Sequence, residues 1–233
     1  MLKKLFSSIH GGKGSWWKIS RKKDDKKPGK QLEDNFAKEL EEVGFTNLDK
    51  QELIDKEETQ WEQLKKEIQK KENSEVIANN FSSQTINKFI YSPFGVQDYP
   101  DFLVFTSKYI IPIELKSSMV AKPVWNSHLP RGNGLYIFAS QNDITFFRGI
   151  DVIDKILYKK LAQFFQKEEQ IKTIEKEFNE KLPKSERGWK VYIRIAYNQA
   201  KSLLLPQGGL NYFEHPKRKE IEGKVLEWLE DKD

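Results

Sequence analysis

The stretch YPDFLVFTSKYIIPIELKSS, residues 99–118, contains two apolar, β-prone runs that are separated by residues 107–108. If those two residues form the turn of an antiparallel hairpin, the paired positions sum to 215, and Asp101 lies opposite Glu114. A loop one residue longer or shorter would place the two carboxylates on opposite faces. In the favoured register their Cβ atoms are about 4.5–5.5 Å apart. Lys116 projects from the same face as Glu114 because side chains alternate along a strand.

Two carboxylates at this distance repel each other unless a proton or a cation lies between them. A hard divalent cation such as Mg²⁺ binds carboxylate and backbone oxygens, keeps several waters, and can lower the pKa of an attacking water. The Lys116 ammonium would then orient or help to deprotonate that water, or stabilise the negative charge of a phosphorane. The alternative is a structural ion pair between Lys116 and one carboxylate on a half-exposed hairpin.

Pro100-Asp101, twelve intervening residues and then Glu114-Leu115-Lys116 resemble the motif of the PD-(D/E)XK nuclease superfamily. The resemblance implies a mixed sheet flanked by helices, with Asp101, Glu114 and the Leu115 carbonyl as Mg²⁺ ligands and Lys116 at the nucleophilic water. Family members often carry a further Glu on the helix before the sheet. Here the best candidate is Glu33, which could equally be an ordinary first-turn Glu that complements the helix dipole.

Helical and strand patterns alternate along the rest of the chain. Apolar residues at helical spacing predict a helix from Gly29 to the αL-compatible Gly44 and a second, more exposed one over residues 50–72. Five strands are expected between Phe89 and Ile150, and further helices and one strand after them. The predicted helices cover residues 151–182 and the segment after Pro216, and the predicted strand covers residues 189–197. We therefore expect an α/β (α+β) fold with a mixed central β-sheet flanked by helices.

The bulk composition favours a single cytoplasmic domain. The chain of 233 residues has no Cys and no apolar run of membrane-spanning length, so disulfides and thiolate metal sites are excluded. The net charge of +5 comes from the N-terminus, because residues 1–30 alone carry ten basic and two acidic residues. We interpret residues 1–28 as a basic arm, with Trp16 and Trp17, that either binds a polyanion or is a solvated tail, and residues 29–233 as one nuclease domain.

The loop at residues 122–134, KPVWNSHLPRGNG, is dense in side chains that could read DNA bases. The candidate DNA-binding residues are Lys122, Trp125, Asn126, Ser127, His128, Arg131 and Asn133. A loop of Pro, Asn and Gly with no such role would have the same composition. A second, weaker candidate surface comprises Arg194, Asn198, Gln199, Lys201 and Gln207.

Together these features predict a Mg²⁺-dependent type II restriction endonuclease that hydrolyses double-stranded DNA to leave 5′-phosphates. A palindromic site would require a two-fold dimer, so we expect a homodimer and no membrane association. Two alternatives remain open: a structure-selective repair or recombination nuclease of the same fold, and a DNA-binding module that has kept the fold without catalysis.

Overall fold

The hairpin of the opening stretch forms in the predicted register. Strands β4 (Phe102–Phe105) and β5 (Tyr109–Ser117) are antiparallel, and Phe102 pairs with Ile113. The Thr106 N–H donates to the Tyr109 carbonyl at 2.9 Å and closes the two-residue turn. The positions therefore pair with a sum of 215, as the sequence predicts.

This hairpin lies inside a mixed sheet in the computed structural model, which describes residues 1–18, 28–69, 76–95, 98–118, 121–126, 130–153, 155–183, 188, 196–197 and 211–232. The sheet has seven strands in the order β1-β3-β4-β5-β7-β8, with β2 also paired to β5. The β1–β3 and β5–β7 pairs are parallel and the others antiparallel. The other strands are β1 (Thr46–Asn47), β2 (Ile77–Ala78), β3 (Lys88–Tyr91), β7 (Leu135–Ala139) and β8 (Ile144–Arg148), with β6 (Trp125–Asn126) and β9 (Ala196–Tyr197) forming a separate pair.

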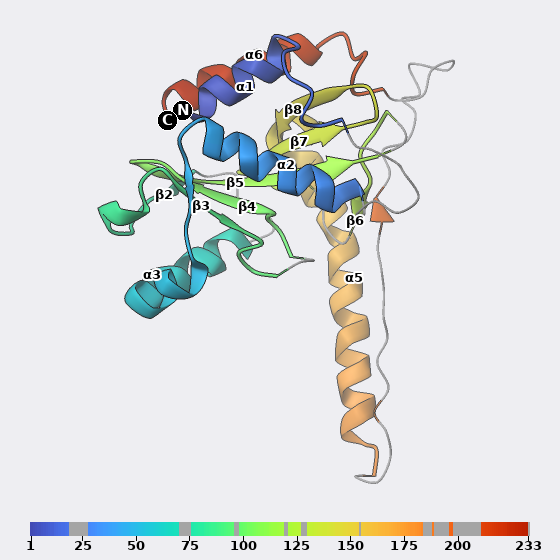
Figure 1. Cartoon of the computed structure of the whole chain (residues 1–233). Coiled ribbons are helices and arrows are strands. Elements are labelled where there is room, and N and C mark those ends of the chain that lie inside the picture. Colours follow the sequence, from blue (N-terminus) through green and yellow to red (C-terminus); the bar gives the residue numbers. More distant parts are fainter. Residues whose placement is uncertain are drawn as a thin grey trace.

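Helices cover both faces of this sheet (Figure 1). The described residues contain α1 (Leu2–His10), α2 (Pro28–Glu42), α3 (Lys50–Gln69), α4 (Gly149–Val152), α5 (Lys155–Glu180) and α6 (Arg218–Glu230), besides a short 3₁₀ turn at Ser83–Thr85. Helices α1, α2 and α6 pack on one face, whereas α3 packs on the other. The mixed α/β class is therefore confirmed.

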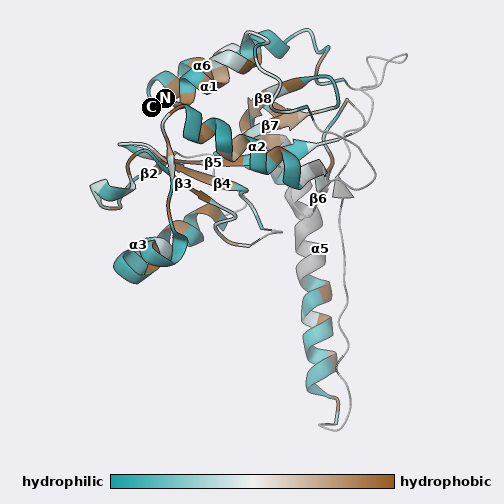
Figure 2. Cartoon of the chain, in the orientation of Figure 1, coloured by the Kyte–Doolittle hydropathy of each residue, from teal (hydrophilic) through white to brown (hydrophobic). Residues whose placement is uncertain are grey.

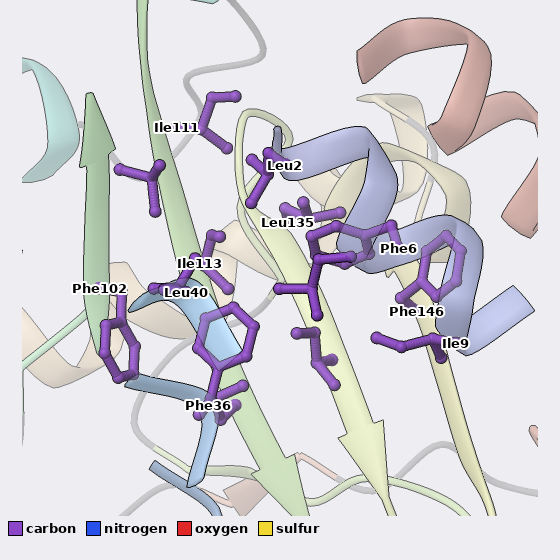
Figure 3. Packing of buried hydrophobic residues seen from close by; sticks show 14 of the residues in the cluster. Leu2, Phe6, Ile9, Phe36, Leu40, Phe102, Ile111, Ile113, Leu135 and Phe146 are labelled. Carbon is purple, nitrogen blue, oxygen red and sulfur yellow. The ribbon is translucent and has the colours of Figure 1, made fainter. Parts of the chain in front are cut away.

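The strands are apolar on both sides because both faces are covered. On the face of α1, α2 and α6, Phe36 meets Phe102 with ring centroids 5.1 Å apart, and Phe6 meets Phe146 at 5.0 Å (Figure 3). On the other face, α3 contributes Trp61 and Leu64 to a second cluster. The sheet is consequently the middle layer of three.

The N-terminal segment is not a solvated arm in its first 18 residues. The apolar residues of α1 are almost fully buried: Leu2, Leu5, Phe6 and Ile9. At the end of α1, Lys219 of α6 donates to the His10 carbonyl at 2.6 Å, and the His10 ring lies 2.9 Å from the buried Glu222 carboxylate. The prediction of a separate arm over residues 1–28 is therefore wrong for α1, because its apolar face completes the core; residues 19–27 lie outside the described residues.

Most of the other predicted elements form where the sequence placed them. Helix α2 is followed by Gly44 with a φ of +103°, the left-handed conformation expected at a helix end. Helix α3 is confirmed over residues 50–69, with non-helical dihedral angles at Glu57. Of the strand predicted at residues 189–197, only β9 falls within the described residues. None of the helices in the described part of the chain is both long and apolar enough to cross a membrane.

Candidate active site

The two predicted carboxylates meet where β5 extends beyond the start of β4. Asp101 immediately precedes β4, whose first residue, Phe102, pairs with Ile113, so the register extended by one position puts Asp101 opposite Glu114. Its Oδ2 accepts a hydrogen bond of 2.7 Å from the Leu115 N–H. The Glu114 side chain is buried, and its Oε1 accepts from the Lys116 Nζ at 2.7 Å. The structure thus brings Asp101, Glu114 and Lys116 together on one strip of the sheet.

The charge on Asp101 is costly at this position. Burial raises the pKa of the Asp101 carboxyl well above its usual value, and the negative charges of Glu114 and Glu33 raise it further. The hydrogen bond from Leu115 and the positive charge of Lys116 act in the opposite direction without cancelling the rise. The site therefore favours a proton or a cation on Asp101.

The donor set fits a magnesium ion that retains water. No three His, Asp or Glu side chains converge on a metal position anywhere in the described residues. Asp101 and Glu114, with the backbone carbonyl of Leu115, instead offer two carboxylates and one carbonyl, which suits a hard cation that keeps several waters. The high pKa of Asp101 supports this fit, since a divalent cation would stabilise both carboxylates in their ionised form.

Glu33 reaches the site from the neighbouring helix through a polar chain. The Tyr91 hydroxyl of β3 donates a short hydrogen bond to the Glu33 carboxylate. The same hydroxyl accepts from the Lys30 Nζ at 2.7 Å, and Lys30 also lies 3.0 Å from Asp34. Because the charge of Glu33 raises the pKa of Asp101, the two carboxylates act on each other electrostatically. Sequence reasoning missed Lys30 and Tyr91, because their contact depends on how α2 packs against β3.

Two tyrosines, Tyr99 and Tyr136, lie beside Glu114 on the side of β7. Tyr136 of β7 is its direct neighbour across the parallel β5–β7 pair, and Tyr99 stacks against Tyr136 with ring centroids 6.3 Å apart. Burial raises the pKa of both hydroxyls, and the charge of Glu114 adds to that rise. Both tyrosines therefore remain protonated and form a wall beside the carboxylate.

Three residues of the predicted DNA-reading loop have internal roles. Trp125 is 1% exposed, and its ring meets Tyr136 edge-on at 5.2 Å. The Arg131 guanidinium donates to the Ile68 carbonyl at 2.6 Å and lies over the Tyr99 ring, while Asn133 is buried. The burial of Trp125 and Asn133 does not agree with the expectation that these two side chains contact DNA, whereas Arg131 is half-buried and its contact with DNA stays a prediction.

The chain around Gly149 packs closely against the loop at Arg131 and restrains it. A Cβ atom added at Gly149 would lie 2.0 Å from the Arg131 carbonyl oxygen, so only glycine fits at that position. The Arg131 N–H also donates to the Tyr136 hydroxyl at 2.7 Å. Residues 131–134 are thus part of the domain's packing.

The structure describes the remaining candidates in this loop only in part. Lys122 is partly exposed, and the backbone of Asn126 pairs with Ala196 in the β6–β9 ladder. Ser127 and His128 lie outside the described residues, as do all members of the second candidate surface: Arg194, Asn198, Gln199, Lys201 and Gln207. Their proposed contacts with DNA stay predictions.

Comparisons of the chain with protein-family models, curated proteins and solved structures give no match. The arrangement of the side chains described above is therefore the basis for a functional proposal.

Proposed function

We propose that this protein is a Mg²⁺-dependent endonuclease that hydrolyses phosphodiester bonds in double-stranded DNA. Two observations carry the proposal: the hairpin pairs Phe102 with Ile113, so that Asp101 is the next position, opposite Glu114, and the Lys116 ammonium lies 2.7 Å from Glu114. A structural ion pair needs only one carboxylate for one ammonium. Here Glu114 already pairs with Lys116. Asp101 is the additional carboxylate, and because its ionisation is unfavourable at this position, it points to a cation site.

Each residue has a chemical role in this proposal. Asp101, Glu114 and the Leu115 carbonyl hold Mg²⁺, which when bound supplies positive charge beside the scissile phosphate and lowers the pKa of water. Lys116 orients the attacking water and stabilises the charge that develops on the phosphate oxygens. Hydrolysis with departure of the 3′-oxygen leaves a 5′-phosphate.

Glu33 supports the site as a third acidic group. The Tyr91 hydroxyl and the Lys30 ammonium fix its position relative to the sheet. We infer that Glu33 would hold a water molecule near the two carboxylates by accepting its hydrogen bond, while Tyr91 is a positioning residue that acts through Glu33.

The more specific proposal is a type II restriction enzyme, which reads a short sequence as a homodimer. The internal contacts of Arg131 and the burial of Asn133 favour a second candidate, a structure-selective nuclease that recognises DNA by its shape. The two candidates share the same chemistry and differ in the surface that binds DNA.

Digestion of a sequenced plasmid and of a synthetic branched DNA, each with the purified protein and Mg²⁺, tests both candidates. Discrete bands support the restriction enzyme, and cleavage of branched DNA alone supports the structure-selective nuclease. Asp101→Ala, Glu114→Ala and Lys116→Ala should each abolish cleavage, whereas Lys108→Ala, an exposed residue in the turn of the same hairpin, should not. Full activity in two of the three site variants, with the fold checked by circular dichroism, contradicts the proposed site.

A further inference from the structure

The outer part of α5, the longest helix of the described residues, projects beyond the sheet (Figure 1). The 26 residues of this helix span about 39 Å at the usual helical rise. Among the elements that the structure describes, no helix or strand packs extensively against it. A helix draws most of its stability from packing of one face, so α5 requires a surface to pack against.

The outer half of α5 carries an exposed apolar stripe. Ile171, Ile174 and Phe178 are 38%, 64% and 49% exposed, and their spacing places them on one side of the helix. Figure 2 shows the outer end of α5 as mostly hydrophilic with a few hydrophobic segments. Exposed apolar side chains gathered in this way mark an interaction surface.

The charges along α5 indicate what covers this stripe. Its first six residues contain three lysines and no acid, whereas its last six contain Glu175, Glu177 and Glu180 with a single lysine. Two copies of α5 in antiparallel orientation bring the basic end of each opposite the acidic end of the other. In parallel orientation, like charges would meet at both ends.

One antiparallel register satisfies the apolar and the charged positions together. When paired positions sum to 335, Ile171, Ile174 and Phe178 lie opposite positions 164, 161 and 157. The sequence has Phe, Leu and Leu at those positions. The same register places Glu175 opposite Lys160 of the second copy, twice because of the two-fold symmetry.

We propose that α5 is a dimerisation helix that pairs antiparallel with α5 of a second copy of this chain, about a two-fold axis between positions 167 and 168. None of these residues belongs to the candidate active site, so the proposal is independent of nuclease activity.

Sedimentation over a range of protein concentrations tests the pairing. Ile174→Glu should raise the dimer dissociation constant about ten-fold or more, because it places charge in the apolar stripe. Thr173→Glu, which changes the charge equally but lies away from the stripe, should leave it within about two-fold. A chain that is monomeric at every concentration overturns the proposal. A monomer whose melting temperature falls on Ile174→Glu also overturns it, because another segment of the same chain then covers the stripe.

Charge reversal tests the register without placing charge in the apolar stripe. Glu175→Lys and Lys160→Glu should each weaken the dimer, because like charges then face each other, and the double variant should restore it. Failure of the double variant to recover the affinity rejects this register.

Cross-linking tests the orientation, and the absence of native cysteines keeps the experiment simple. In the proposed dimer, two copies of Glu168→Cys lie next to the axis and should form a disulfide under mild oxidation. Two copies of Phe178→Cys would be about 32 Å apart along the helices and should not. Efficient cross-linking of both variants indicates a parallel pair and overturns the proposal.

Discussion

Replacing Asp101 with Asn should separate stability from function at the candidate site. The Asn side-chain oxygen can still accept the hydrogen bond that Asp101 Oδ2 receives from the Leu115 N–H at 2.7 Å. The substitution removes the negative charge opposite Glu114 and leaves the size of the side chain nearly unchanged. We therefore expect a more stable protein that does not cleave DNA.

The size of the gain follows from the distance between the charges. Two unit charges about 5 Å apart at an effective dielectric constant of about 20 repel by about 3 kcal/mol. The Lys116 ammonium at 2.7 Å from Glu114 offsets part of this repulsion. We expect Asp101→Asn to raise the free energy of unfolding by about 1–2 kcal/mol in the presence of a chelator at pH 8, or the melting temperature by about 2–8 °C.

The pH dependence has a definite sign. Burial, followed by the charge of Glu114, raises the pKa of Asp101 in the folded state above its value in the unfolded chain. The folded state thus binds a proton more tightly, and the stability of the wild-type protein rises as the pH falls through the folded-state pKa. The advantage of Asp101→Asn should shrink over the same range, because the wild-type carboxyl is then neutral.

In the presence of magnesium, the wild-type protein should become more stable than Asp101→Asn. At one hundred times its dissociation constant, a bound ion stabilises the wild-type protein by about 2.7 kcal/mol, and Asp101→Asn should gain less because it lacks one ligand. Urea unfolding with EDTA or MgCl₂ between pH 5 and 8 measures the effect of the substitution, its pH dependence and the stabilisation by Mg²⁺. Asp98→Asn, the same change at an exposed residue, is the control and should match the wild type. Destabilisation of Asp101→Asn in EDTA, or equal stabilisation of both proteins by Mg²⁺, refutes the reasoning.

Three further predictions concern residues around the core and the site. Phe6→Ala should cost about 3–5 kcal/mol in urea unfolding because Phe6 is fully buried against Phe146, whereas Lys4→Ala on the exposed side of α1 should have little effect. Tyr91→Phe should slow cleavage about ten-fold or more through loss of the contact with Glu33, with a loss of only about 1 kcal/mol in stability; an unchanged cleavage rate would remove Tyr91 from the site. Arg131→Ala should lower the melting temperature through loss of about 1–3 kcal/mol, and altered sequence preference at unchanged stability would instead support base reading.

Much of the candidate site could be predicted from the sequence because it lies within one hairpin. The two-residue turn determines the register, and the register determines that Asp101 faces Glu114. Both effects are local, so they need no knowledge of the rest of the fold. The contact of Glu33 with Tyr91 is different, because it joins residues on two elements that only tertiary packing brings together.

The sequence of the N-terminal helix contains an amphipathic pattern, but the basic residues around it led to the prediction of an arm. Leu2, Leu5, Phe6 and Ile9 have the spacing of an amphipathic helix, while the ten basic residues in the first 30 suggested an arm. Their burial on the sheet shows that the apolar pattern determined the structure of this segment. Burial of four apolar side chains outweighs the interactions of solvated charges, which contribute little to the fold.

The sequence by itself determined five strands between Phe89 and Ile150, the hairpin register and the helix that ends before Gly44, because periodicity and turn chemistry act over a few residues; the short strands β1, β2 and β6 were not predicted. Only the tertiary structure showed that Trp125 and Asn133, in the loop at residues 122–134, are buried and that Arg131 contacts the end of α3. The Trp, Arg and Asn side chains of this loop suit either DNA or the protein interior, and their composition is the same in both cases. The close approach of Gly149 to Arg131 and the contact of Arg131 with the end of α3 fix residue 131 against the domain. Such contacts join segments that are distant in sequence, and no local pattern encodes them.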